Sequence, residues 1–193
     1  MKTFFVGDTH FGHANIMKHD GRPFKTIEEM DEFMIKVWNE RVSPEDEVYI
    51  LGDFSWYKKE KTDEILSRLN GKKYLVRGNH DKFNRNNRPN FDLVLGEKTT
   101  IRVGGFKVIL NHVPELFYVG DTRDDVVMLY AHLHNSVEDV LCQKAKDFIV
   151  AEAKKLGYPI KMQAFNVGCM HFGYGPVTLE TIINKNIINE EGA

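Results

Sequence analysis

Several apolar segments of this chain, each typical of a buried strand, end in side chains that can bind metal ions. The segments cover residues 3–7, 47–51, 73–76, 106–110 and 126–130. They are followed, in order, by Asp8-Thr9-His10, Gly52-Asp53, Gly78-Asn79-His80-Asp81, Asn111-His112 and Ala131-His132-Leu133-His134. In α/β proteins, functional sites lie beyond the carboxyl ends of the strands. This placement predicts one composite site built from distant parts of the chain.

The stretch Gly78-Asn79-His80-Asp81 is the centre of that pattern. The glycine lets the backbone turn after the strand. Asn, His and Asp have poor helix and strand propensities, so we expect a loop that serves chemistry rather than packing.

The remaining segments predict a layered fold. Thr26 with Glu29 fits a capping box before a helix that ends near Arg41. Further helices are expected at 62–69, 140–156 and 178–189, a hairpin at 98–110 with a Gly104-Gly105 turn, and a strand at 162–167. The polar segment 8–24 is expected to be a functional loop. We predict a single α/β domain over residues 1–193, in which two sheets pack face to face with helices outside.

Composition excludes several classes of protein. The formal net charge is -2, so binding to a nucleic-acid polymer is not indicated, and no apolar run is long enough to cross a membrane. Cys142 and Cys169 make no disulfide framework, and without thiolate pairs a structural zinc domain is not expected. We therefore expect a cytoplasmic, reduced environment.

The candidate ligands suit transition metals. Asp8 and His10 are two residues apart, as are His132 and His134. In extended backbone each such pair would point to one side. Carboxylate, amide and imidazole donors favour Mn, Fe, Zn, Co or Ni. More ligands are present than one ion takes, so we expect two divalent cations that share a carboxylate, for which Asp53 is the best candidate.

Together, Asp8-x-His10, Gly52-Asp53, Gly78-Asn79-His80-Asp81, His112 and His132-x-His134 resemble the calcineurin-like metallophosphoesterase family. The resemblance implies a two-sheet αββα sandwich with a dinuclear centre. It implies one cation held by Asp8, His10, Asp53 and His134, and another held by Asp53, Asn79, His112 and His132. His80 matches the family's histidine that contacts the substrate phosphate. Ala131 departs from the pattern, because the family usually has glycine there.

The segments Asp8–Ile16 and Arg22-Pro23-Phe24 resemble a small bacterial and phage branch of that family. Here the alternatives stay open. His13 either reaches substrate or caps the loop, and Arg22 either holds a phosphate oxygen or lies over Phe24. Asp81 either orients His80 as a catalytic partner or finishes the turn. The neighbouring Lys82, Arg85 and Arg88 are expected to be a solvated cluster, His19 and His171 surface residues, and Cys169 and Met170 packing residues.

The resemblance implies a phosphoester hydrolase that uses a metal-bridging hydroxide, with His80 as general acid. The chain is short and has no added capping segment, so a phosphodiesterase acting on a small or nucleotide-like substrate is favoured. The alternatives are a phosphomonoesterase and a non-catalytic scaffold of the same fold.

Overall fold

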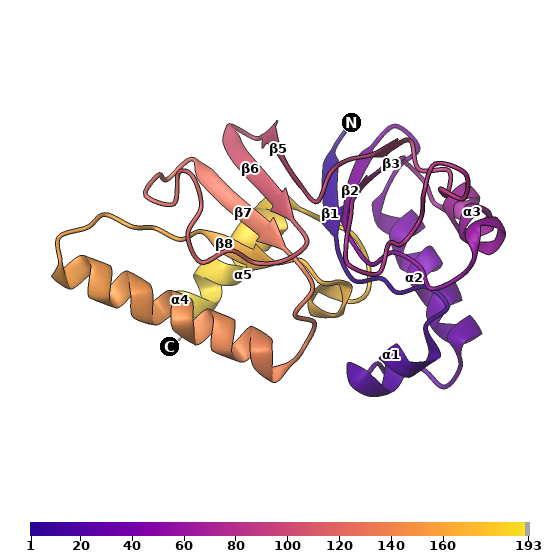
Figure 1. Ribbon diagram of the computed structural model, residues 1–193, viewed down its shortest axis with the longest axis horizontal. Helices are drawn as coiled ribbons and strands as arrows, with labels where there is room; N and C mark the ends of the chain where they lie inside the picture. The colour runs from indigo at the N-terminus through magenta and orange to yellow at the C-terminus, as the bar shows by residue number, and fades with distance from the viewer. Residues whose placement is uncertain (192–193) are drawn as a thin grey trace.

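Two β-sheets lie face to face in the computed structural model, which describes the backbone of residues 1–191 and the side chains of residues 1–185 (Figure 1). One sheet has the strand order β4-β3-β2-β1-β9 and the other β5-β6-β7-β8. The strands are β1 (Thr3–Val6), β2 (Glu47–Leu51), β3 (Lys72–Val76), β4 (Leu93–Val94), β5 (Lys98–Val103), β6 (Phe106–Asn111), β7 (Val126–Tyr130), β8 (Ala164–Asn166) and β9 (Val177–Thr178).

Helices cover the outer faces of both sheets. The five-stranded sheet is flanked by α1 (Ala14–His19), α2 (Ile27–Arg41) and α3 (Lys59–Arg68), whereas α4 (Val137–Lys155) lies beside the four-stranded sheet (Figure 1). A short 3₁₀ helix, η1 (Cys169–Phe172), precedes β9, and α5 (Leu179–Glu191) follows it. The expected α/β fold with two sheets between helices is confirmed.

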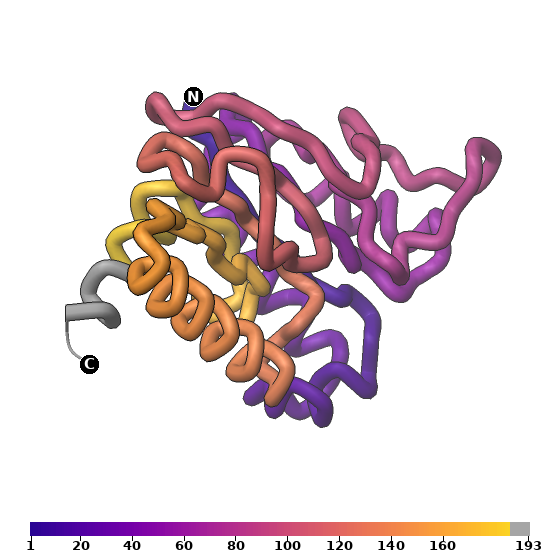
Figure 2. The backbone as a smooth tube through the Cα atoms, turned by 60° about the vertical axis from the view of Figure 1, so that its left-hand side comes forward, coloured from indigo at the N-terminus to yellow at the C-terminus, as the bar shows by residue number. Residues whose placement is uncertain are grey.

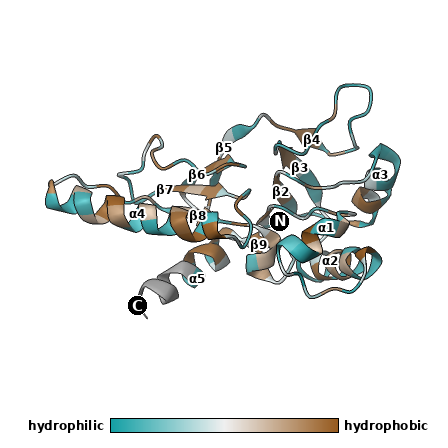
Figure 3. Ribbon diagram, turned by 60° about the horizontal axis from the view of Figure 1, so that its bottom comes forward, coloured by the Kyte–Doolittle hydropathy of each residue, from teal (hydrophilic) through white to brown (hydrophobic). Residues whose placement is uncertain are grey.

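Alternation along the strands explains the layers. Phe4 and Val6 of β1 pack with α2 in an outer core, while Phe5 faces the second sheet. The same alternation separates Ile50 from Leu51 in β2. A strand with both faces buried lacks the simple apolar-polar alternation of a surface strand, which is why β1 and β2 are apolar after their first residues. The strands β6 and β7 are likewise mostly hydrophobic (Figure 3).

Most expected elements have the predicted type and place. The Thr26 hydroxyl accepts a hydrogen bond from the Glu29 N–H at 3.1 Å and caps α2 as predicted. Two other helices begin three residues earlier than expected: α3 begins at Lys59 rather than Thr62, and α4 begins at Val137, after the Ser136 cap, rather than at Val140.

The segment 8–24 is not all loop, because it contains the six-residue helix α1. Ile16 is the one buried residue of α1, so the segment has too little apolar periodicity to predict a helix. The strands β4 and β9 were not predicted either. Each has two residues, which is too short for an alternating pattern.

Strand direction brings the functional loops together. β1, β2 and β3 are mutually parallel, and so are β6 and β7 in the other sheet. The loops that leave their carboxyl ends can therefore meet where the two sheets adjoin. In the part of the chain that the structure describes, no helix has the length and hydropathy needed to cross a bilayer.

We predict that Phe5→Ala lowers the free energy of unfolding by about 3–5 kcal/mol, because it opens a cavity between the sheets. Phe5 is fully buried, whereas Phe148 on α4 is 65% exposed. Phe148→Ala is the matched control, and it should change stability by less than about 0.5 kcal/mol. Urea unfolding measures the stability of both variants. Equal losses in the two variants would contradict the burial of Phe5 between the two sheets.

Candidate metal centre

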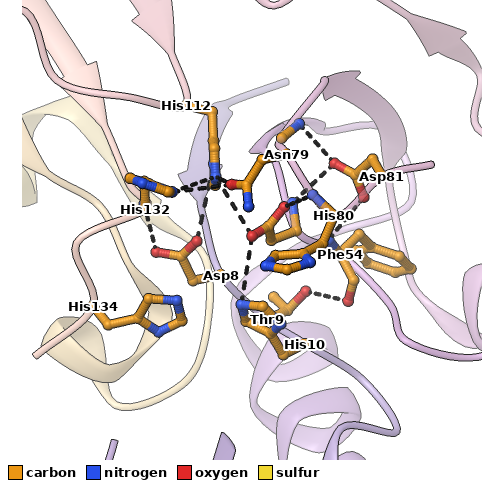
Figure 4. Close-up of polar contacts among 12 residues, drawn as sticks. Asp8, Thr9, His10, Phe54, Asn79, His80, Asp81, His112, His132 and His134 are labelled. Carbon is orange, nitrogen blue, oxygen red and sulfur yellow. Dashed lines mark hydrogen bonds and ion pairs between the residues drawn. The ribbon is translucent and has the colours of Figure 1, made fainter. Parts of the chain in front are cut away.

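Three of the predicted ligands meet at one end of the site (Figure 4). Asn79 Oδ1 lies 2.8 Å from His112 Nε2 and 3.0 Å from His132 Nδ1. The two imidazole nitrogens are 3.2 Å apart. His112 Nδ1 is 2.8 Å from the carbonyl oxygen of Leu51, to which it donates, so Nε2 is the ring nitrogen that faces this group. Three donor atoms this close to one another form a suitable set for a cation.

A second group lies beside the first. Asp8, His10 and His134 each place a potential ligand atom within 4.8 Å of the others, and so do Asp8, Asp53 and His112. Asp53 lies between the two groups, since its Oδ2 is 3.5 Å from His112 Nε2 and 3.7 Å from His10 Nε2. The structure thus brings together all seven residues that were predicted as ligands.

Unpaired polar atoms show that this donor set fits a metal. Among the described residues, Asp8 Oδ1 and both ring nitrogens of His10 are buried without a hydrogen-bond partner. Leaving a buried polar group unpaired costs about 1–3 kcal/mol, so such atoms call for a partner. A divalent cation would satisfy them, and carboxylate with imidazole donors is suitable for a transition metal.

The charges within the cluster also indicate a cation site. Burial, with the neighbouring His134, lowers the pKa of His10 to about 2, so its imidazole is neutral. Burial also lowers the pKa of His112, but its interactions with Asp53 and Asp8 outweigh this effect and raise it to about 9. Without a cation, the positive charge that the two carboxylates need is therefore carried by His112.

The ligands have an unusual backbone conformation. Asp8, His10, Asp53, His132 and His134 all have positive φ, between 50° and 69°. The described residues include only two other non-glycine residues of this kind, Met162 and Tyr174. The expectation that the ligand pairs lie in extended backbone is therefore wrong. They converge through left-handed turns after the strands, and such strain is concentrated at functional sites.

Two glycines let the loops after β2 and β3 touch. A Cβ on Gly52 would lie 2.6 Å from Gly78 Cα, and a Cβ on Gly78 would lie 2.3 Å from Asp53 Oδ1. No side chain larger than hydrogen fits in either place. The loop carrying Asp53 and the loop carrying Asn79 are therefore packed backbone to backbone.

The side chain of Asp81 stabilises the contact between these two loops. Its carboxylate accepts hydrogen bonds from the backbone N–H groups of Asp53 at 2.9 Å, Gly78 at 2.8 Å and Phe54 at 3.2 Å. The predicted catalytic role of orienting His80 does not fit these contacts. The alternative, that Asp81 finishes the turn, does fit, and the carboxylate also ties this turn to the loop after β2.

Arg22 likewise faces inward. It is 4% exposed, and its guanidinium donates to Asp20 Oδ2 at 2.9 Å, to the carbonyl oxygen of Thr9 at 2.9 Å and to that of Asp8 at 2.8 Å. A side chain with its donors used in this way is not placed to hold a substrate phosphate. The predicted substrate contact of Arg22 therefore does not fit the structure, and neither does an arginine lying over Phe24 at the surface.

His80 lies at the open side of the cluster, and its backbone N–H donates to Asp53 Oδ1 at 2.9 Å. Its ring centroid is 4.5 Å from that of Trp56, which also stacks on His13 at 4.0 Å. Trp56 is 45% exposed and was not predicted. The available signal was its position three residues after Asp53, but a lone tryptophan in a loop has no pattern that marks it as part of a site.

The remaining predicted surface and packing residues mostly lie as expected. Lys82, Arg85, Arg88 and His19 are exposed, and Cys169 is buried with its thiol 3.2 Å from the Asp8 carbonyl oxygen. His171 differs, since it is partly buried and its Nε2 lies 3.0 Å from the carbonyl oxygen of His134. It supports the loop after β7 rather than standing free at the surface.

We predict that Gly78→Ala weakens Mn²⁺ binding, because the new methyl group would displace the Asp53 carboxylate, and lowers the free energy of unfolding by about 1–3 kcal/mol. Calorimetric titration with Mn²⁺ and urea unfolding measure the two effects. Gly96→Ala is the matched control, since a Cβ there meets nothing closer than 3.8 Å. Wild-type Mn²⁺ affinity in Gly78→Ala would contradict this account of the loop contact.

Comparison with known proteins agrees with the fold. The chain is 35% identical to the uncharacterized protein MJ1445 of Methanocaldococcus jannaschii, over 94% of this chain and 89% of that protein. It is 30% identical to the Gene 66 protein of Mycobacterium phage L5, over 69% of this chain and 77% of the phage protein. It shares its fold with the crystal structure of the protein AQ665 from Aquifex aeolicus, with a TM-score of 0.71, 24% identity and coverage of 95% and 97% of the two chains. Residues 1–153 match the model of the calcineurin-like phosphoesterase superfamily domain, and the chain belongs to that superfamily.

Proposed function

We propose that this protein hydrolyses phosphodiesters with the help of two divalent transition-metal ions. The observation that carries the proposal is the position of Asp53 between the Asn79–His112–His132 group and the Asp8–His10–His134 group, 3.5 Å and 3.7 Å from a nitrogen of each. Two cations held that close repel each other, and a shared carboxylate offsets the repulsion. Mn, Fe, Zn, Co and Ni all suit these ligands.

The residues have distinct tasks in this proposal. Asp8, His10, Asp53 and His134 would hold one ion, and Asp53, Asn79, His112 and His132 the other. When bound, the ions would lower the pKa of a water molecule and offset charge on the phosphoryl oxygens. His80, which is exposed beside Asp53, would donate a proton to the leaving oxygen, and His13 would contact the substrate.

A diester is favoured because hollows lie on both sides of the cluster. His10, His13 and His134 line a hollow of about 460 Å³, and Asn79 and His112 line a separate one of about 410 Å³. A phosphate held between them would have room for an ester group on each side. The substrate would be a small or nucleotide-like diester, and a cytoplasmic location stays a prediction.

The test compares an aryl phosphodiester with the matching monoester on Mn²⁺-loaded protein. We expect faster hydrolysis of the diester, and no hydrolysis after the metal is removed by a chelator. Preference for the monoester would indicate a phosphomonoesterase of the same family. Bound Mn²⁺ without hydrolysis of either ester would favour a non-catalytic scaffold.

We predict that Asp53→Asn and His80→Ala each lose most of the turnover while the protein stays folded. Loss of a general acid costs roughly 10²–10⁴-fold, and the loss should be greatest on esters with poor leaving groups. Asp125→Asn, which changes an exposed carboxylate far from the site, should keep the wild-type rate. A near wild-type rate of His80→Ala on an alkyl diester would show that His80 is not the acid.

A further inference from the structure

A carboxylate that the sequence pattern did not single out lies behind one of the candidate ligands. His134 Nδ1 is 3.0 Å from Asp20 Oδ1 and 3.1 Å from Asp20 Oδ2. The Asp20 side chain is 3% exposed, which is unusual for a carboxylate. Asp20 directly follows α1, so residues 114 positions apart are joined here. Figures 1 and 2 show this N-terminal segment beside the first turn of α4.

The guanidinium of Arg22 fixes Asp20 in turn. Nε and Nη2 of Arg22 both lie 2.9 Å from Asp20 Oδ2, and the Arg22 side chain is fully buried. The same guanidinium donates to the carbonyl oxygens of Asp8 and Thr9. One buried ion pair thus connects the backbone that carries two ligands, Asp8 and His10, with the ring of a third, His134.

This arrangement selects one nitrogen of His134. A carboxylate beside Nδ1 favours the tautomer in which Nδ1 carries the proton, and the lone pair then lies on Nε2. Hydrogen bonds from metal-binding histidines to carboxylates are common, because they hold the ring in place and strengthen the ligand.

We propose that Asp20, held by Arg22, is a positioning residue that orients His134 as a metal ligand. The proposal rests on the two-ion site described above. It assigns Asp20 to the ion held by Asp8, His10, Asp53 and His134, and leaves the ion at Asn79, His112 and His132 independent of it. If the ion pair were purely structural, removing it would instead lower the stability of the fold and change the affinity for the two metal ions equally.

The experiment is titration of metal-stripped protein with Mn²⁺ by calorimetry. Asp20→Ala should weaken the binding of one of the two ions by roughly 10–100-fold and leave the other unchanged. Asp20→Asn keeps an oxygen that can accept the His134 N–H, so its loss should be smaller. The absorption spectrum of Co²⁺-loaded Asp20→Ala should also differ from that of the wild type, because the ligand set of one ion changes.

Asp125 provides a matched control. It accepts hydrogen bonds from Nε and Nη2 of Arg123, two residues away, both at 2.7 Å, but this pair is exposed. Asp125→Ala should bind both ions as the wild type does.

Asp20→Ala leaves the Arg22 charge buried and unpaired, which can destabilise the fold. If thermal unfolding of the metal-free protein shows that this variant does not fold, the double variant Asp20→Ala/Arg22→Leu takes its place, since it buries no unpaired charge. Because this variant also lacks the Arg22 donors to the carbonyl oxygens of Asp8 and Thr9, the loss at the same ion should be at least as large, with the other ion unchanged.

Unchanged affinity for both ions in the folded variant would overturn the proposal, and so would an equal loss at both. A wild type that binds no Mn²⁺ would overturn this proposal and the proposed function together. A wild type that binds two ions but hydrolyses no phosphoester would contradict only the proposed function.

Discussion

The structure depends on the left-handed backbone of its ligand residues. Five candidate ligands have positive φ although none is glycine. Each such residue costs of order 1–3 kcal/mol unless its surroundings fix it. Each follows a strand that is hydrogen-bonded into a sheet, so the sheets hold the turns in place. Because of this backbone conformation, side chains from separate loops point at one small volume.

Buried polar contacts between the loops make this arrangement rigid. Asp81 binds three backbone N–H groups across the β2 and β3 loops, and Arg22 binds two backbone carbonyl oxygens after β1. Both side chains are ionisable and lie close to the candidate centre, yet their hydrogen bonds are made within the protein. These contacts add to the support from the sheets and explain how the strained turns stay in position.

Much of the fold could be predicted because strand and helix signals are local. β2 and β7 have the expected limits, and the Thr26 cap places the start of α2. The short elements α1, β4 and β9 could not be predicted, since two to six residues give no reliable period. Ala131 shows a different limit. Its Cβ lies 2.4 Å from where a Cβ on residue 7 would be, so Gly7 accommodates it. Only the packing of β1 against β7 reveals that pairing.

By itself, the sequence determined the longer strands and helices and the identity of the seven candidate ligands. It could do so because periodicity and donor chemistry are properties of residues and their neighbours in the chain. The tertiary structure alone decided what Asp20, Arg22, Trp56 and Asp81 contact. The partner of a buried polar side chain depends on which distant segment lies opposite it, and no pattern within the segment contains that information. The same residue types that suggest a substrate contact in the sequence therefore serve, once buried, to hold the ligands in place.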